Sequence, residues 1–331
     1  MSERAIEQSA VGGAQGDAFG SAPADDVPIP YMQRVRDYYQ ALGYGRPYAW
    51  AQQAEVPFQP LAKPLSDCRV TLVTTAAPYQ PDKGDQGPGA PYNAAAKFYG
   101  VYSGDTGREH DLRNVHVAID RGHTSQGDQG CYFPLAALRR AAGEGRIGSL
   151  APRFFGLPTN RSHRVTLGTD CPELVARCLT DGVDAALLVP NCPVCHQSVS
   201  LAAGALERNG IATVVMGCAK DIVEHVGVPR LLFSDFPLGN GAGRPNDPES
   251  QDVTLELAFK LLETAPAART AVQSPLRWSG SADWKRDYMN LEALTPEEIA
   301  RRRKEFDRQK DVAKALREGS GKAGPEVSER A

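Results

Sequence analysis

Three apolar, β-branched segments alternate with two helix-like segments between residues 183 and 237. VDAALLVP, IATVVMG and RLLFSDFP have the continuous apolar character of strands buried on both faces. The intervening segments, VCHQSVSLAAGALERNG and KDIVEHVG, have helical composition, and the first ends at Asn209-Gly210, a common left-handed terminator. A β-α-β-α-β series requires parallel strands joined by crossovers. The alternation therefore predicts an α/β fold with a Rossmann-like parallel sheet flanked by helices.

Further elements extend this pattern in both directions. A buried strand is expected at Arg69–Ala77, which leaves open whether two similar halves begin near residues 68 and 169. The expected helices are Tyr31–Ala41, a helix capped at Thr169 or Asp170 and ended at Gly182, a helix opened by Asp247 and Pro248, and a charged helix that begins at Thr295.

We expect four regions along the chain. These are a disordered arm (1–26), an α/β half with an irregular, aromatic-rich entry (27–168), an α/β half that carries a C-x-x-C motif (169–265), and an extension with a charged helix and a frayed tail (266–331).

Composition limits the function classes. The net charge of −3 gives no argument for nucleic-acid or membrane partners, and no apolar run approaches the roughly 20 residues that span a bilayer. The N-terminal residues lack the apolar region of a signal peptide, so we expect a cytoplasmic protein. In that compartment the 7 cysteines stay reduced unless they bind metal or carry out redox chemistry.

The motif C-x-x-C-H comprises Cys192, Cys195 and His196. This spacing fits haem attachment, half of a zinc site, a thioredoxin-like disulfide, or a nucleophilic thiol with a resolving partner. Because Cys192 follows a strand and precedes a helix, the helix dipole is expected to lower its pKa below roughly 8.5. Cys195 lies one turn further on, where it can form a disulfide with Cys192. The absence of an export signal disfavours haem.

Two other interpretations of the cysteines stay open. A zinc site needs further ligands, which Cys218, His196 or the histidines of residues 110–123 could supply. The pair could also be small core side chains, which is the expectation for Cys171 and Cys178.

The loop LGNGAGRP follows the strand RLLFSDFP and so emerges at the same sheet edge as Cys192. Gly239, Gly241 and Gly243 would let backbone amides approach an anion, and Arg244 could pair with it. The alternative is a flexible turn before the next helix. His196 either faces the substrate or lies along its helix.

The segment from DAALLVPNCPVCHQSV to GNGAGRPNDPESQ, residues 184–251, resembles the selenoprotein B family of glycine, sarcosine and betaine reductases and D-proline reductase. The resemblance extends more weakly over most of residues 30–265. It implies that Cys192 occupies the position of a selenocysteine that attacks a substrate carbon and displaces an amine, and that Cys195 resolves the adduct. This chain has sulfur there. The family's amino-acid reductases also use a pyruvoyl group on a separate subunit.

The resemblance includes the spacing H-x-x-x-D at His116 and Asp120, which makes them candidates for proton transfer. We therefore expect an oxidoreductase, a thiol-dependent reductase of a small polar, anionic substrate. It would hold no tight cofactor and be re-reduced by a thioredoxin-like dithiol. Two rivals remain: a zinc lyase or hydrolase with Cys192, Cys195 and either a histidine or Cys218 as ligands, and a non-catalytic subunit of a reductase complex. A partner subunit or a homo-oligomer is expected.

Overall fold

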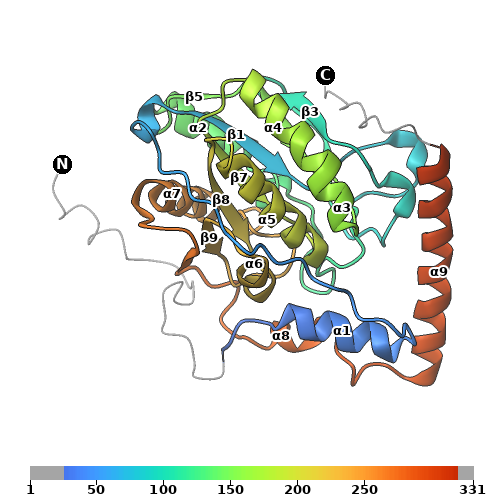
Figure 1. Cartoon of the computed structure of the whole chain (residues 1–331). Coiled ribbons are helices and arrows are strands. Elements are labelled where there is room, and N and C mark those ends of the chain that lie inside the picture. Colours follow the sequence, from blue (N-terminus) through green and yellow to red (C-terminus); the bar gives the residue numbers. More distant parts are fainter. Residues whose placement is uncertain (1–25, 320–331) are drawn as a thin grey trace.

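A central eight-stranded sheet organises the computed structural model, which describes residues 26–319 (Figure 1). Its order is β10-β9-β8-β7-β1-β6-β3, and short β5 also pairs with β1. All pairings in this sheet are parallel except β3 with β6, which confirms the predicted α/β fold. The strands are β1 (Arg69–Thr74), β2 (Ala77–Pro78), β3 (Tyr102–Asp105), β4 (Leu112–Arg113), β5 (Ser149–Leu150), β6 (Arg153–Gly156), β7 (Ala185–Val189), β8 (Ala212–Gly217), β9 (Arg230–Phe233) and β10 (Thr270–Gln273).

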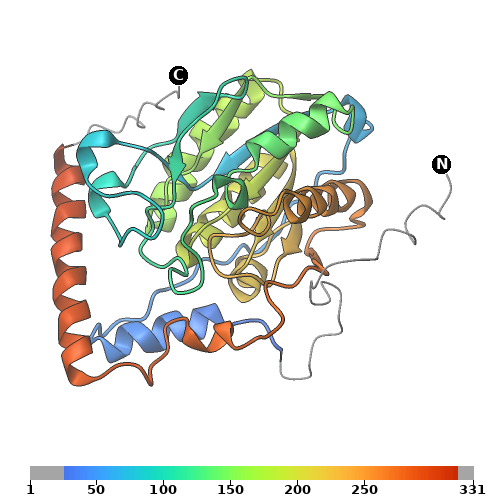
Figure 2. The same cartoon turned by 180° about the vertical axis from the view of Figure 1, so that it is seen from behind.

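Helices cover both faces of the sheet. Helices α4, α5 and α6 pack on one face, and α2 and α7 pack on the other (Figures 1 and 2). The helices are α1 (Tyr31–Ala41), α2 (Leu135–Gly143), α3 (His163–Val165), α4 (Cys171–Thr180), α5 (Pro193–Glu207), α6 (Lys220–Val226), α7 (Pro248–Thr264), α8 (Trp284–Asp287) and α9 (Pro296–Gly319). None of the described helices has the length and apolar character needed to cross a bilayer.

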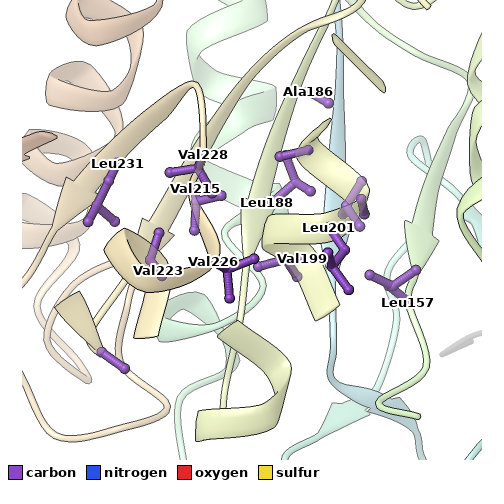
Figure 3. Packing of buried hydrophobic residues seen from close by; sticks show 14 of the residues in the cluster. Leu157, Ala186, Leu188, Val199, Leu201, Val215, Val223, Val226, Val228 and Leu231 are labelled. Carbon is purple, nitrogen blue, oxygen red and sulfur yellow. The ribbon is translucent and has the colours of Figure 1, made fainter. Parts of the chain in front are cut away.

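The strands have apolar sequences because helices cover both faces of the sheet. Leu188 of β7 packs with α5 and α6 in one core cluster, whereas Leu187 and Val189 lie in the cluster on the opposite face. Figure 3 shows Leu188 beside Val199 of α5 and Val215 of β8. Because side chains alternate along a strand, burial of both faces requires an uninterrupted apolar sequence.

Most predicted helix ends are confirmed. The Asp247 carboxylate accepts a hydrogen bond from the Ser250 amide (3.0 Å) at the start of α7, and Gly210 has a φ of 82° after α5. The cap predicted at Thr169 or Asp170 is wrong, because both residues lie inside a helix. A π-helical turn at residues 166–170 continues directly into α4, and the Asp170 carboxylate instead accepts a hydrogen bond from the Asn160 amide (2.7 Å).

The sheet joins three of the four predicted regions. β1 of the first half pairs with β7 of the second, and β10 of the C-terminal extension pairs with β9. The two halves differ in construction, because short 3-10 turns and the β2–β4 pair separate β1 from β6. Residues 1–25 of the predicted arm (1–26) and residues 320–331 of the predicted tail lie outside the described residues, and Asp26, the last residue of that arm, pairs with Arg277 (3.1 Å).

Helix α9 runs along one side of the molecule, beyond the sheet (Figures 1 and 2). Its Phe306 ring packs against Tyr39 and Tyr44, at 5.5 and 5.3 Å between ring centroids. Gln309 accepts a hydrogen bond from the Ala94 amide (3.0 Å). These contacts hold α9 against the end of α1 and over the carboxyl edge of the sheet.

We expect Leu188→Ala to lower the free energy of unfolding by about 2–5 kcal/mol, because it opens a cavity between β7 and its covering helices. Leu179→Ala is the matched control: Leu179 is 52% exposed on α4 and its loss should cost about 0.5 kcal/mol. Urea unfolding of both variants measures the difference. Equal effects would contradict the packing described for β7.

Candidate active site

The candidate site lies at the carboxyl ends of the central strands β1, β6 and β7. β1 and β7 are parallel neighbours whose register ends at Thr74 opposite Val189. From β1 the sheet continues to β6 on one side of this pair. From β7 it continues to β8 on the other side. A sheet that winds in opposite directions from two neighbouring strands has a crevice beyond their carboxyl ends, where ligands commonly bind.

The two cysteines occupy the turn between β7 and α5. Cys192 is the N-cap of α5, and its Sγ accepts a hydrogen bond from the Cys195 amide (3.4 Å). The two Sγ atoms are 2.8 Å apart, and both residues are free thiols. The Asn191 amide donates to Thr75 Oγ1 (3.1 Å), which attaches the turn to the end of β1.

His116 and Thr159 complete the surroundings of the thiols. His116 Nε2 lies 2.6 Å from the Thr75 carbonyl oxygen, and since a carbonyl only accepts, Nε2 carries the proton. The ring also hydrogen bonds to Cys195. Thr159 Oγ1, just after β6, is 3.1 Å from Cys195 Sγ. A histidine and a hydroxyl therefore converge on the second cysteine of the motif.

The lowered thiol pKa belongs to Cys195 and not, as expected from the sequence, to Cys192. Burial raises the pKa of both thiols, but hydrogen bonds from Cys192, His116 and Thr159, with the attraction of His116, outweigh burial and hold the pKa of Cys195 well below its ordinary value. Burial and the hydrogen bond to Cys195 raise the pKa of Cys192. At Cys192, burial and the hydrogen bond to Cys195 therefore outweigh the effect of the helix N-terminus on the pKa. The negative charge of the pair resides on Cys195.

His196 supports the turn from inside the protein. Nδ1 lies 2.8 Å from the Cys192 carbonyl oxygen, and Nε2 accepts hydrogen bonds from the amides of Cys218 (2.9 Å) and Ala219 (3.1 Å). Burial lowers the His196 pKa to about 4, so the ring is neutral near pH 7. Both nitrogens are engaged, and the structure does not bring His196 to the cavity beside Cys192.

A cavity of about 50 Å³ lies against Cys192, while Cys195 is fully buried behind it. His116 and Thr159 form part of its wall. The rest of the wall combines aliphatic residues with four aromatic or cationic side chains, Tyr39, Tyr92, Lys97 and Arg161. Of the two thiols, Cys192 is therefore the one that meets a molecule in this cavity.

Sequence reasoning missed Thr159 and Arg161, although a usable signal was present. FFGLPTNR, residues 154–161, begins as a buried strand and then becomes polar, like the segment that leads to Cys192. Parallel strands bring their carboxyl ends to one edge, so the polar residues after β6 belonged among the candidates.

The glycine loop and Arg244 are occupied by internal contacts. Arg244 donates to Asp247 Oδ2 (2.8 Å) and to the Arg277 carbonyl oxygen (2.9 Å). A Cβ at Gly241 would lie 2.5 Å from the Met216 carbonyl oxygen, so this glycine permits close packing. None of these loop residues lines the cavity beside Cys192.

Asp120 does not pair with His116. Its carboxylate accepts hydrogen bonds from the amides of Gly122 (3.1 Å) and His123 (3.2 Å) and lies 3.0 Å from His123 Nδ1. It borders a separate cavity of about 310 Å³ under α9. The spacing H-x-x-x-D would align two residues on a helix, but this segment forms turns, so the side chains diverge.

Cys218 also lies apart from the thiol pair. Burial raises its pKa to about 12, against hydrogen bonds from the Asn240 and Phe236 amides. Cys171 and Cys178 are core residues of α4, as predicted. Among the described residues, the one group of three close metal-binding side chains is His116, Cys192 and Cys195, within 4.8 Å of one another.

Thiolate and imidazole are typical zinc ligands, and the Thr75 carbonyl orients His116 as outer partners of metal-binding histidines do. Of the further zinc ligands considered from the sequence, the structure brings His116 to the two cysteines and leaves Cys218 and His196 apart from them.

Comparison with known proteins places the chain in a family. It is 31% identical over 221 residues to the D-proline reductase subunit gamma of Acetoanaerobium sticklandii, a match that covers 66% of this chain and 88% of the relative. The chain belongs to the selenoprotein B family of glycine, sarcosine and betaine reductases and D-proline reductase. The sequence resemblance is thereby confirmed.

Two further relatives are longer. The chain is 28% identical to the glycine reductase complex component B subunit gamma of Carboxydothermus hydrogenoformans, of which it covers 50%, and 24% identical to the betaine reductase complex component B subunit beta of Peptoclostridium acidaminophilum, of which it covers 41%. These names support a role for the chain in a reductase complex. No family model and no solved structure matches it.

The neutral state of His196 makes stability depend on pH. Its pKa is about 4 in the folded chain and about 6.5 when unfolded, so its stabilising effect is present above pH 6.5 and is lost as pH falls towards 4. Asparagine cannot titrate. We therefore expect His196→Asn to reduce the decrease in the free energy of unfolding between pH 6.5 and pH 4.5 by roughly 2–3 kcal/mol. Urea unfolding at both pH values measures it. An unchanged pH dependence would show that His196 is not buried as a neutral ring.

Proposed function

We propose that the protein is a thiol-based reductase subunit in which Cys192 attacks a small polar substrate and Cys195 resolves the product. The observation that carries this proposal is the 2.8 Å contact between two free thiols of which only Cys192 borders the cavity. The membership of the reductase family supports it.

The protonation of the pair supports this division of roles. In the first step, Cys195 takes the proton of Cys192 while the Cys192 sulfur attacks the substrate carbon. A C–S bond forms, and the bond from carbon to the leaving group breaks. The leaving group departs with that electron pair and takes a proton from water. The contact between the two sulfur atoms makes this proton transfer direct.

In the second step, Cys195 attacks Cys192. The S–S bond forms and the C–S bond breaks, and the carbon leaves with the electron pair and takes a proton from His116, to which the proton of Cys195 then passes. The substrate has gained two electrons and the two thiols have become a disulfide. An external dithiol, such as a thioredoxin-like partner, then reduces that disulfide by exchange.

A second candidate function is a zinc-dependent lyase or hydrolase. The observation in its favour is the convergence of His116, Cys192 and Cys195 within 4.8 Å. In that case both thiols would be ligands and neither would be alkylated without loss of the metal. A non-catalytic role in a complex is the third reading, and substitution of both cysteines separates it from the first two.

We expect iodoacetamide at pH 7 to alkylate Cys192 ahead of the other cysteines, because Cys192 borders a cavity and can pass its proton to Cys195. Cys195→Ala removes that acceptor and should slow alkylation of Cys192 about tenfold or more, in line with a lost general base. Peptide mapping by mass spectrometry measures both rates. Cys178→Ala, a core cysteine of α4, is the control and should leave the rate unchanged.

Faster labelling of Cys218 or Cys68 than of Cys192 would contradict the assignment. An equal rate for Cys192 with and without Cys195 would show that Cys195 is not its proton acceptor.

A further inference from the structure

A second and larger cavity adjoins the thiol site. It has a volume of about 540 Å³, within the range of roughly 300–1,000 Å³ of small-molecule sites. Its walls come from α1, the loop after α1, α3, the first turn of α5, and α9. Figure 1 shows α1 and α9 meeting at one corner, with α3 on the side of the sheet that faces it. Val35, Tyr39, Arg161 and Val194 line both this cavity and the small one beside Cys192.

The charged side chains of this larger cavity are basic. Arg36, Arg46, Arg161 and Lys310 line it, with His163 beside them, and no carboxylate of the described chain does so. Asp37 pairs with Arg36 (3.3 Å) and Asp307 lies 3.8 Å from Lys310. Arg46 and Arg161 have no carboxylate partner among residues 26–319. A rim with uncompensated cations attracts anions and is well suited to a carboxylate or phosphate.

The interior of the same cavity is aromatic. Tyr39, Tyr44, Tyr48 and Phe306 line it, all partly buried. Tyr44 and Phe306 are 5.3 Å apart between ring centroids and Tyr39 and Phe306 are 5.5 Å apart, so the rings form a continuous apolar surface. Flat unsaturated groups pack well against such rings. An inorganic anion alone would leave this surface unfilled.

We propose that this cavity binds anions with a flat, unsaturated body, and that it is the substrate site through which Cys192 is reached. The anion site is independent of the proposed function. The claim that the cavity is the substrate site leading to Cys192 rests on that function. The anionic group lies on Arg46 and Arg161, and the flat body lies against Tyr39, Tyr44 and Phe306. Tyr39 hydrogen bonds to Arg161 at the wall between the two cavities. A bound anion replaces Tyr39 as the partner of Arg161 and so opens the way to Cys192.

The test measures binding of matched probes to the full chain by titration calorimetry. The probes are 2-naphthoate, cinnamate and indole-3-acetate, each compared with its neutral amide. We expect at least one anion to bind and its amide to bind about tenfold more weakly. Arg46→Gln and Arg161→Gln should each weaken that binding about fivefold, the effect of one exposed ion pair. Arg308→Gln is the control. This arginine of α9 pairs with Glu305 outside the cavity, so its substitution should leave the affinity for the anion unchanged.

A second readout connects the cavity to the thiol. The bound anion at saturation should slow alkylation of Cys192 by iodoacetamide about fivefold or more, and Arg46→Gln should restore the rate at the same probe concentration. No binding of any of the three anions, equal binding of the amides, or full affinity in both arginine variants would overturn the anion site. Binding without protection of Cys192 would overturn its connection to the substrate. A failure of Cys192 and Cys195 to form a disulfide would refute the redox function and leave the anion site standing.

Discussion

The pairing of β1 with β7 determines where the candidate active site lies. It brings Thr75, which follows β1, beside the turn that carries the thiols. The Thr75 hydroxyl accepts the Asn191 amide (3.1 Å), and its carbonyl oxygen lies 2.6 Å from His116 Nε2. One residue therefore holds both the cysteine turn and the histidine. His196 fastens the same turn to the end of β8 through the Cys192 carbonyl oxygen. Because these contacts are buried, the sulfur atoms are positioned before a substrate arrives.

Within this frame, the environment separates two chemically identical thiols. Cys195 is fully buried and receives hydrogen bonds, so it holds the negative charge, whereas Cys192 keeps its proton and borders the cavity. In the low dielectric of the interior, two adjacent thiolates would repel strongly, so the pair shares one proton. In the proposed function, Cys192 is the nucleophile and Cys195 is its adjacent proton acceptor. On that proposal, the adjacent acceptor favours the use of sulfur at the position where the family resemblance implies selenium.

The sequence was sufficient for the regular part of the fold and for the thiol pair. Buried parallel strands have a distinct apolar pattern, and Asp247 and Gly210 mark helix ends through local chemistry. Contacts between distant segments were not predictable. Arg244 is held by Asp247 and the Arg277 carbonyl, and Asp120 by its own turn, so neither reaches Cys192. His116 reaches Cys195 only because the long connection between β1 and β6 folds back over the sheet edge.

The central claim is that Cys192 and Cys195 form a reversible redox pair. It is tested most directly by mass spectrometry of the peptide that contains both cysteines, after mild oxidation of freshly purified protein and again after treatment with thioredoxin. We predict a single intrapeptide disulfide between Cys192 and Cys195, with the other cysteines free, and complete return of both thiols on reduction. Both thiols free after oxidation, with stoichiometric zinc in the same sample, would contradict it.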